Sequence, residues 1–423
     1  MWTPARPLLV AAAVAVGIAA VPASRAEDVG LSTERLQRIP QLVQRYINDK
    51  QITGAVTVVT RKGRTAHFEA TGLMDAESKA PMRKDGVFRM ASMTKPVIGV
   101  AILMLAEDGK LRLTDPVSRF IPEFKDPKVA MLKNGSASAD APGSRSEAPE
   151  IYTVPAARAI TIRDLMTHTS GLESGGAGSR EGERIAPRKT SDNLAGYIPK
   201  LGAVPLDFQP GTMWRYSALA GIEVLGRIVE VVSGQTLDVF LKQRIFDPLG
   251  MKDTGFGPTE VNQPRVVTLY RKVPTGLERQ ETPAWLATKT LFSGGGGLWS
   301  TAEDYTQFAQ MLVNGGEMNG KRLLGPRTVD LMASNHVGQL FAESNQTGTR
   351  RGMGFGLTVE VVLDPIAANR RTSAGSFGWD GAFGTHFWAD RTEQLAGIIL
   401  IQQSTNAQLS RDFENAVMQA VID

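Results

Sequence analysis

The most informative absence in this chain of 423 residues is cysteine. Without cysteine the chain has no disulfide bond, no thiolate nucleophile and no lipid-modified cysteine anchor. Histidine is scarce too: the four histidines are scattered and show no metal-site spacing. We therefore expect no metal and no other cofactor, and a fold whose stability depends on its hydrophobic core.

The chain also lacks an excess of charge of one sign. Its 47 basic and 43 acidic residues are interspersed and give a net charge of +4. Basic residues gather only in short clusters, such as residues 61–64 and 370–371, and no basic stripe or polybasic patch is present. We therefore expect no nucleic-acid partner.

Long apolar runs are limited to the N-terminus. Arg6 precedes an uncharged apolar run at residues 8–21, which is shorter than the about 20 residues that a membrane-spanning helix needs. Small residues follow at positions 23–26, where a signal peptidase requires them. We predict a signal peptide over residues 1–26, cleaved before Glu27, with no stable membrane anchor and a periplasmic or secreted mature protein.

Both ends of the chain show strand and helix patterns. Four segments predict two hairpins: residues 55–60, 65–70, 385–390 and 395–402. Two further segments predict a helix before the first hairpin and a helix after the second: residues 32–47 and 406–422. This arrangement predicts an antiparallel sheet built from both termini and flanked by the terminal helices.

The middle of the chain is predicted to be mostly helical and rich in loops. Three segments have a helical pattern: residues 92–109, 221–234 and 236–250. Two segments have no hydrophobic period and are predicted to be long loops: residues 125–158 and 172–190. The fold class is therefore mixed α/β (α+β), with a sheet domain of residues 27–91 and 290–423 and an inserted helical domain of residues 92–289. The cleft between the two domains is the expected active site.

Ser92 and Lys95 stand three residues apart at the start of an apolar segment, residues 96–106. The Ser-x-x-Lys pattern alone is weak evidence, because a chain of this composition contains about one by chance. In a helix, however, positions i and i+3 share a face, and the lack of charge over residues 96–106 predicts a buried helix. The pair is either a nucleophile with its base or a helix-start serine beside a solvated lysine.

The first of these interpretations has a physical basis at a helix N-terminus. Desolvation and the helix dipole both favour the neutral amine of Lys95, which can accept a proton. The same dipole favours an oxyanion that develops at Ser92.

Two further segments fit acyl-transfer chemistry. Tyr216 lies beside Ser217, and a phenol near an ammonium can pass a proton to a leaving group or from a water. Residues 375–390 place glycines around Trp379, which suits a strand edge that a substrate approaches closely. The alternative interpretations are a buried tyrosine and a structural glycine-rich hairpin.

Three motifs thus occur in order along the chain: Ser92-Met-Thr-Lys95, Tyr216-Ser217 and Trp379-Asp380-Gly381. They resemble the three motifs of the serine β-lactamase and penicillin-binding-protein superfamily. The resemblance spans about residues 30–420 and is nearest to the class C β-lactamase-like branch that includes the family VIII carboxylesterases. It implies a β-lactamase/transpeptidase-like fold.

The resemblance also implies roles for single residues. Ser92 would attack an acyl carbonyl and form a covalent acyl-enzyme, while Lys95 accepts its proton directly or through Tyr216. Tyr216 would then protonate the leaving group and activate the deacylating water. The oxyanion hole would consist of the backbone N–H groups of Ser92 and Ala382. Substrate binding would fall to the third motif: Trp379, Asp380 and Gly381.

Two departures from the family pattern bear on the substrate. Members that act on β-lactams or peptides usually have a lysine where this chain has Trp379, and Asp380 adds a negative charge. Position 218 is Ala rather than the Asn of Tyr-x-Asn, which removes an amide that could bind an acylamido group. Both changes favour neutral, apolar esters, unless one of four loop arginines replaces the lysine: Arg350, Arg351, Arg370 or Arg371.

We therefore expect a serine hydrolase that cleaves carboxylic esters, with β-lactam hydrolysis as a side activity. The alternative within the same class is a class C-type β-lactamase or a D-alanyl peptidase-like enzyme. The alternative from another class is a catalytically inactive periplasmic binding protein on the same fold. The partner is accordingly a small-molecule ester or β-lactam, and the sequence leaves the oligomeric state open.

Other patterns in the sequence are weaker. Residues 191–193, Ser-Asp-Asn, match a motif of a different branch of the superfamily, but they lie in a charged stretch. A Ser–His–Asp hydrolase is disfavoured because the chain contains no Gly-x-Ser-x-Gly segment. His168 and His386 are expected to be structural.

Overall fold

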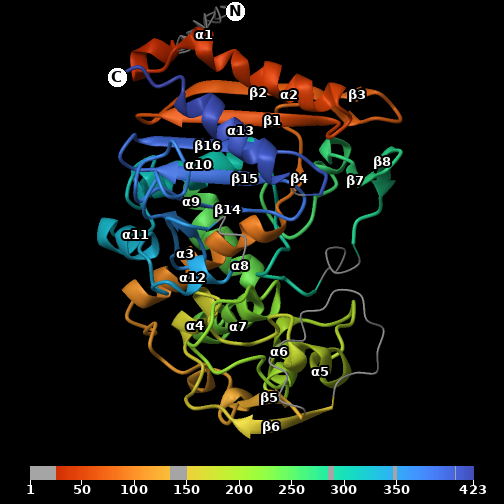
Figure 1. The fold of residues 1–423 in the computed structure, drawn as a ribbon, viewed down its shortest axis with the longest axis vertical. Coiled ribbons are helices and arrows are strands. Elements are labelled where there is room, and N and C mark those ends of the chain that lie inside the picture. The colour runs from red at the N-terminus through yellow and green to blue at the C-terminus, as the bar shows by residue number, and fades with distance from the viewer. Residues whose placement is uncertain (1–24, 134–149, 284–289, 346–349, 405) are drawn as a thin grey trace, which may run out of the picture.

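The computed structural model describes residues 25–133, 150–283, 290–345, 350–404 and 406–423 (Figure 1). Most of the predicted signal peptide therefore lies outside the described residues, and its cleavage before Glu27 stays a prediction. In the described ranges no helix is both long enough and apolar enough to cross a membrane.

An antiparallel sheet of eight strands takes its strands from both ends of the chain (Figure 1). The N-terminal strands are β1 (Gly54–Arg61), β2 (Arg64–Asp75) and β3 (Ala80–Pro81). The C-terminal strands are β12 (Met353–Phe355), β13 (Glu360–Val362), β14 (Phe377–Asp380), β15 (His386–Asp390) and β16 (Leu395–Leu400). Their spatial order is β12-β13-β14-β15-β16-β1-β2-β3, which confirms the predicted fold class.

The antiparallel pairing of β1 with β16 joins the two ends of the chain, with Val58 opposite Ile398. Side chains alternate along a strand, so Ile398 and Ile399 of β16 belong to separate hydrophobic clusters. Three helices cover the sheet: α2 (Arg38–Asn48) and α13 (Ala407–Met418) on one face, and α10 (Ala302–Val313) on the other (Figure 1). Both faces of the sheet are therefore buried.

The terminal helices form where the sequence predicts them. Ser32 caps the short helix α1 (Thr33–Leu36) by accepting a hydrogen bond from Arg35 N at 3.3 Å. The helix α2 follows and buries four residues at helical spacing: Ile39, Leu42, Val43 and Tyr46. At the other end, Asn406 caps α13 by accepting from Leu409 N at 3.1 Å. Capping and apolar period thus agree at both ends of the chain.

The helix α3 (Thr94–Glu107) is buried on all sides, because every side chain from residue 94 to residue 105 is buried. A helix that is apolar around its whole circumference belongs in a core. It continues from a 3-10 turn, η2 (Ala91–Met93), and packs against α7 (Ala220–Ser233). The start of α3 is therefore held rigidly inside the molecule.

The other described helices connect and surround these elements. They are η1 (Ala26–Val29), η3 (Val117–Arg119), η4 (Pro122–Phe124), α4 (Ile162–Met166), α5 (Ala177–Ile185), α6 (Leu194–Leu201), α8 (Leu237–Leu241), η5 (Lys242–Phe246), α9 (Asp247–Leu249), η6 (Gln263–Arg265), α11 (Pro326–Met332) and α12 (Leu340–Glu343). Four small two-stranded pairs complete the fold: β4 (Phe88–Arg89) with β9 (Trp299–Ser300), β5 (Lys128–Leu132) with β6 (Ile151–Pro155), β7 (Leu269–Val273) with β8 (Gly276–Gln280), and β10 (Glu317–Met318) with β11 (Lys321–Arg322).

Both predicted loops were wrong in part. Of residues 125–158, positions 134–149 lie outside the described residues, and the described part contains the antiparallel pair of β5 and β6, two short strands with little alternation of buried and exposed residues. Residues 172–190 contain α5, whose glycines argue against a helix by propensity alone. In the structure these glycines allow close packing, because a Cβ at Gly178 would lie 2.1 Å from Pro205 O. The domain boundaries at residues 92 and 290 stay a prediction.

Candidate active site

Ser92 stands in η2, in the short connection between β4 and α3. The preceding residue, Ala91, has a φ of 46°, a left-handed conformation that residues with a Cβ rarely adopt. Such strain persists where the surrounding contacts fix the backbone. Here Met90 N donates to Leu298 O at 2.9 Å, directly beside the β4–β9 pair. The strained turn presents Ser92 at the start of the buried helix.

Lys95 lies one turn further along and is 0% exposed. Its Nζ lies 3.0 Å from Ser92 Oγ and donates to the carbonyl oxygens of Ala218 and Gly295, each at 2.6 Å. Burying an ammonium or amine is costly unless its donors are satisfied, and these three oxygens satisfy them. The alternative interpretation of a solvated lysine does not fit this burial.

Tyr216 completes the predicted catalytic group. Its hydroxyl donates to Ser92 Oγ at 2.7 Å, and the Lys95 Nζ lies 4.9 Å from the centre of its ring. A cation at this distance from an aromatic face is attracted by the ring. The structure therefore brings Ser92, Lys95 and Tyr216 together, although Tyr216 lies far from the other two along the chain.

His168 holds the backbone on both sides of Tyr216. Its carbonyl oxygen accepts from Arg215 N at 3.1 Å, and its Nδ1 accepts from Ser217 N at 3.3 Å. Burial, together with the nearby charge of Lys95, lowers the pKa of His168 well below its usual value. The neutral ring therefore acts as a structural clamp on the tyrosine segment.

The third motif reaches the site through the hairpin turn between β14 and β15. Thr385 Oγ1 donates to Met90 O at 3.0 Å, two residues before Ser92. A Cβ at Gly381 would lie 2.4 Å from the same Met90 oxygen, so the close approach requires glycine. Ala382, the next residue, thus stands on a turn that packs against the segment carrying Ser92. The oxyanion-hole role of the Ser92 and Ala382 N–H groups stays a prediction.

The remaining residues of the third motif have different surroundings. The ring of Trp379 packs against Tyr216, with 5.7 Å between centroids, and against Phe355, with 5.3 Å. The carboxylate of Asp380 lies 2.5 Å from His386 Nδ1 on the neighbouring strand. Trp379 therefore adjoins Tyr216, whereas Asp380 already has a histidine partner. Their predicted contact with substrate stays a prediction.

Sequence reasoning missed the carbonyl groups that hold Lys95. The Gly295 oxygen comes from a run of glycines at residues 294–297, where a Cβ at Gly295 would lie 2.7 Å from Leu219 Cα. That run of glycines was a usable signal, because repeated glycine often marks a close backbone approach. No sequence pattern indicated the role of the Ala218 carbonyl, because every residue type has a backbone carbonyl that can accept a hydrogen bond.

A buried ion pair holds the residue that directly precedes the glycine run at 294–297. Glu223, which is 0% exposed, accepts from Arg188 Nη1 at 2.9 Å and Nη2 at 2.5 Å. It also accepts from Ser293 Oγ at 2.5 Å, and Ser293 stands two residues before Gly295. Glu223 therefore fixes the segment whose Gly295 carbonyl accepts from Lys95.

Most of the loop arginines considered as replacement cations have other partners. Arg350 stacks on the rings of Trp214 and Phe341 at 4.6 and 4.5 Å from their centres. Arg370 donates to Glu414 at 2.5 Å, and Arg371 is bonded to Asn415. Residues 191–193 serve a capping role, because Asn193 Oδ1 accepts from Gly196 N at the start of α6.

A family model described as Beta-lactamase matches residues 39–420. The chain therefore belongs to the β-lactamase family of serine enzymes, which confirms the resemblance inferred from the three motifs. It is a serine hydrolase by class.

Individual relatives cover most of the chain. Protein Rv1367c of Mycobacterium tuberculosis is 36% identical over 83% of this chain and 86% of its own length. Esterase EstB of Burkholderia gladioli is 30% identical over 86% of this chain and 89% of its own length. Among solved structures, EstCE1, a hydrolase with promiscuous acyltransferase activity, matches with a TM-score of 0.75 and 27% identity. That match covers 91% of this chain and 99% of EstCE1.

The buried Glu223 pair yields a stability prediction. In Glu223→Gln the shape is kept, but Arg188 loses its counter-charge, and breaking a buried pair costs about 3 kcal/mol or more. Urea unfolding at pH 7 should show this loss in the free energy of unfolding. Glu181→Gln is the matched control, because Glu181 pairs with Arg184 at the surface of α5. The control should lose less than about 1 kcal/mol, and equal losses in both variants would contradict the assignment.

Proposed function

We propose that the protein is a carboxylesterase that works through a covalent acyl-Ser92 intermediate. The observation that carries this proposal is the convergence of two groups on Ser92 Oγ: Lys95 Nζ at 3.0 Å and Tyr216 OH at 2.7 Å. A serine hydroxyl becomes an effective nucleophile when a base lies within hydrogen-bond reach.

The surroundings of Lys95 suit a proton acceptor. A neutral amine has two N–H donors and one lone pair. To act as the base, Lys95 must first give up the proton that it donates to Ser92 Oγ; the neutral amine then keeps two N–H groups for the carbonyl oxygens of Ala218 and Gly295, both at 2.6 Å, and has a lone pair free for the Ser92 proton. As Oγ attacks the acyl carbon, its proton passes to Lys95 and the carbonyl electron pair moves onto the oxygen.

Tyr216 then carries the proton onward. Its hydroxyl is bonded to Ser92 Oγ, so it lies where the departing alcohol leaves the acyl group. Proton transfer from Tyr216 to the leaving oxygen, with Lys95 as the source, releases the alcohol and leaves the acyl-enzyme. In the reverse sense, the same pair takes a proton from the water that attacks the acyl-enzyme and returns it to Ser92.

The oxyanion of both steps needs donors in place before reaction. Ser92 N and Ala382 N are the proposed donors, because the hairpin turn that carries Ala382 rests on the backbone before Ser92. Removing one donor of such a hole typically costs about 10²-fold to 10³-fold in kcat.

The preference for esters rests on the charge and shape of the third motif. Trp379 presents an indole beside Tyr216 where β-lactam-binding relatives carry a cation. The carboxylate of Asp380 is paired with His386, and Arg370 is paired with Glu414. An apolar wall beside Tyr216 suits a neutral acyl group, and EstB and EstCE1 are described as an esterase and a hydrolase.

Relative turnover of an ester and a lactam tests the substrate class. We expect kcat/KM for p-nitrophenyl butyrate to exceed that for nitrocefin by at least about 100-fold, because a site lacking a polar partner rejects the substrate that needs one. Initial rates of both reactions with one enzyme preparation supply the ratio. A ratio in favour of nitrocefin would instead identify a β-lactamase, the second candidate that the family match itself favours.

Covalent labelling tests whether the protein is an enzyme at all. A fluorophosphonate probe should label the wild-type protein at one serine and fail to label Ser92→Ala. Ser191→Ala is the matched control, because Ser191 belongs to the Ser-Asp-Asn stretch and should keep full labelling. A wild-type protein that takes no label would support the inactive binding protein on the same fold.

Removal of the base tests the mechanism. Lys95→Ala should lower kcat for the ester by at least about 100-fold, the usual worth of general-base assistance. Tyr216→Phe, which deletes only the hydroxyl, should also lower kcat. Steady-state kinetics checks both, with Lys110→Ala as the control, since Lys110 is exposed beyond the end of α3. A Lys95→Ala enzyme with the wild-type rate would exclude the amine from the reaction.

A further inference from the structure

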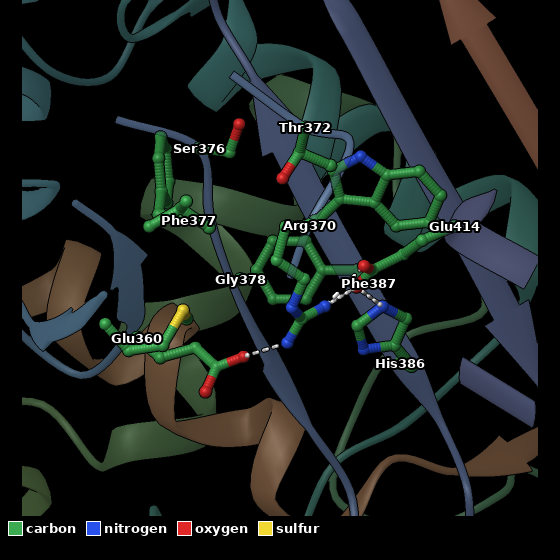
Figure 2. Close-up of a pocket in the computed structure, with 12 residues that line it drawn as sticks. Glu360, Arg370, Thr372, Ser376, Phe377, Gly378, His386, Phe387 and Glu414 are labelled. Atoms are coloured by element: carbon green, nitrogen blue, oxygen red, sulfur yellow. Dashed lines mark hydrogen bonds and ion pairs between the residues drawn. The ribbon is translucent and has the colours of Figure 1, made fainter. Parts of the chain in front are cut away.

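A network of charged side chains lies behind the third motif, and Figure 2 shows Arg370 between Glu360 and Glu414, with His386 next to Glu414. Arg370 Nη1 donates to Glu414 Oε1 at 2.5 Å, and its Nη2 lies 3.5 Å from Glu360 Oε1. The cavity that these side chains line measures about 20 Å³. A substrate or cofactor needs a far larger space, so this network is not a second ligand site.

His386 connects the network to the third motif. Its Nδ1 lies 2.5 Å from Asp380 Oδ1, and its Nε2 lies 3.1 Å from Glu414 Oε1. A neutral imidazole has one N–H, whereas an imidazolium has an N–H on each ring nitrogen and a positive charge that attracts both carboxylates. Burial alone would lower the pKa of His386, but the carboxylates of Asp380 and Glu414 outweigh it and raise the pKa to about 10.

The other three histidines behave in the opposite way. Burial lowers the pKa of His67 to about 4 and also lowers the pKa values of His168 and His336. Of the four histidines, all of which lie within the described residues, His386 is thus the one whose surroundings raise the pKa and favour the imidazolium.

The ion pair of Asp380 and His386 joins the two strand ends from which the hairpin turn begins. Asp380 is the last residue of β14, His386 is the first residue of β15, and the two lie opposite each other. Between them stand Gly381 and Ala382, and Gly381 N donates to Thr385 O at 2.7 Å. The far side of the network is anchored in α13 through Glu414.

We propose that His386 is a positioning residue: as an imidazolium between Asp380 and Glu414, it fixes the hairpin turn so that the Ala382 N–H faces the oxyanion at Ser92. This inference rests on the proposed function, since it gives the turn a part in acyl transfer. It also assigns the carboxylate of Asp380 to the turn and not to the substrate, so the third motif presents no uncompensated charge to an acyl group.

Kinetics of four proteins tests the proposal: wild type, His386→Gln, Asp380→Asn and the double variant, all with p-nitrophenyl butyrate. Each single change should lower kcat by about 10-fold to 100-fold with KM nearly unchanged, because a shift of about 1 Å at a catalytic group can cost 10²-fold. Since the two residues act as one pair, the double variant should lose no more than the larger single loss.

The matched control is His67→Gln. His67 is also a buried histidine of the large sheet, but its ring bonds to the neutral hydroxyl of Thr57 at 2.8 Å. This variant should keep the wild-type kcat.

Nitrogen-15 NMR of the imidazole rings gives a readout that a purely structural role would not move. At pH 8 the wild-type spectrum should show one doubly protonated histidine, and His386→Gln should lack that signal.

The groups that face His386 are Asp380 and Glu414, with Arg370 and Glu360 behind Glu414. Losing the Asp380 charge lowers the pKa of His386, so kcat of Asp380→Asn should decline with rising pH well below pH 10.

Two results would overturn the inference: a folded His386→Gln enzyme with wild-type kcat, or a wild type without a doubly protonated histidine at pH 8. If His386→Gln fails to fold, Asp380→Asn decides, because the Asp380 side chain is 44% exposed and its change is mild. An unchanged kcat there contradicts the inference, and a fall at constant KM supports it.

A wild-type protein that takes no fluorophosphonate label overturns the proposed function and this inference together. A labelled wild type with fully active variants overturns this inference alone.

Discussion

The buried amine of Lys95 is the constraint on which the rest of the site depends. A side chain with a charged or strongly polar end that is 0% exposed needs partners for every donor. Those partners come from three separate segments, at Ser92, Ala218 and Gly295. In this structure the burial of α3 brings these segments together, and the convergence that satisfies the amine also places Lys95 beside Ser92.

Strand geometry divides the third motif between two tasks. Neighbouring residues on a strand point to opposite faces, and Trp379 accordingly packs on Tyr216 while Asp380 turns to His386. The side of Trp379 is lined by aromatic rings, and on the other side Asp380 pairs with His386 while Arg370 pairs with Glu414. A substitution of Trp379 thus alters the packing on Tyr216, whereas a substitution of Asp380 alters the contact with His386.

The sequence predicted the parts of the fold whose pattern is local. The hairpin at residues 55–70, the terminal helices and the Ser92–Lys95 face follow from apolar period and helical spacing. The helix α5 could not be predicted in this way, because Gly178 has a low helix propensity and is required instead by the close approach of Pro205. The carbonyl partners of Lys95 and the ion pairs of His386 were also beyond prediction, since they join residues that are distant in the chain.

The order of strands in the sheet has a consequence for how the molecule acquires its activity. The N-terminal strand β1 lies between β16 and β2, so its pairing with β16 cannot form until this C-terminal strand has been synthesised. Contacts between such distant segments form slowly, because a long loop must close before they stabilise anything. During synthesis Ser92 therefore emerges hundreds of residues before the turn between β14 and β15 that packs against its segment, and this contact can form only after the C-terminal strands have been made.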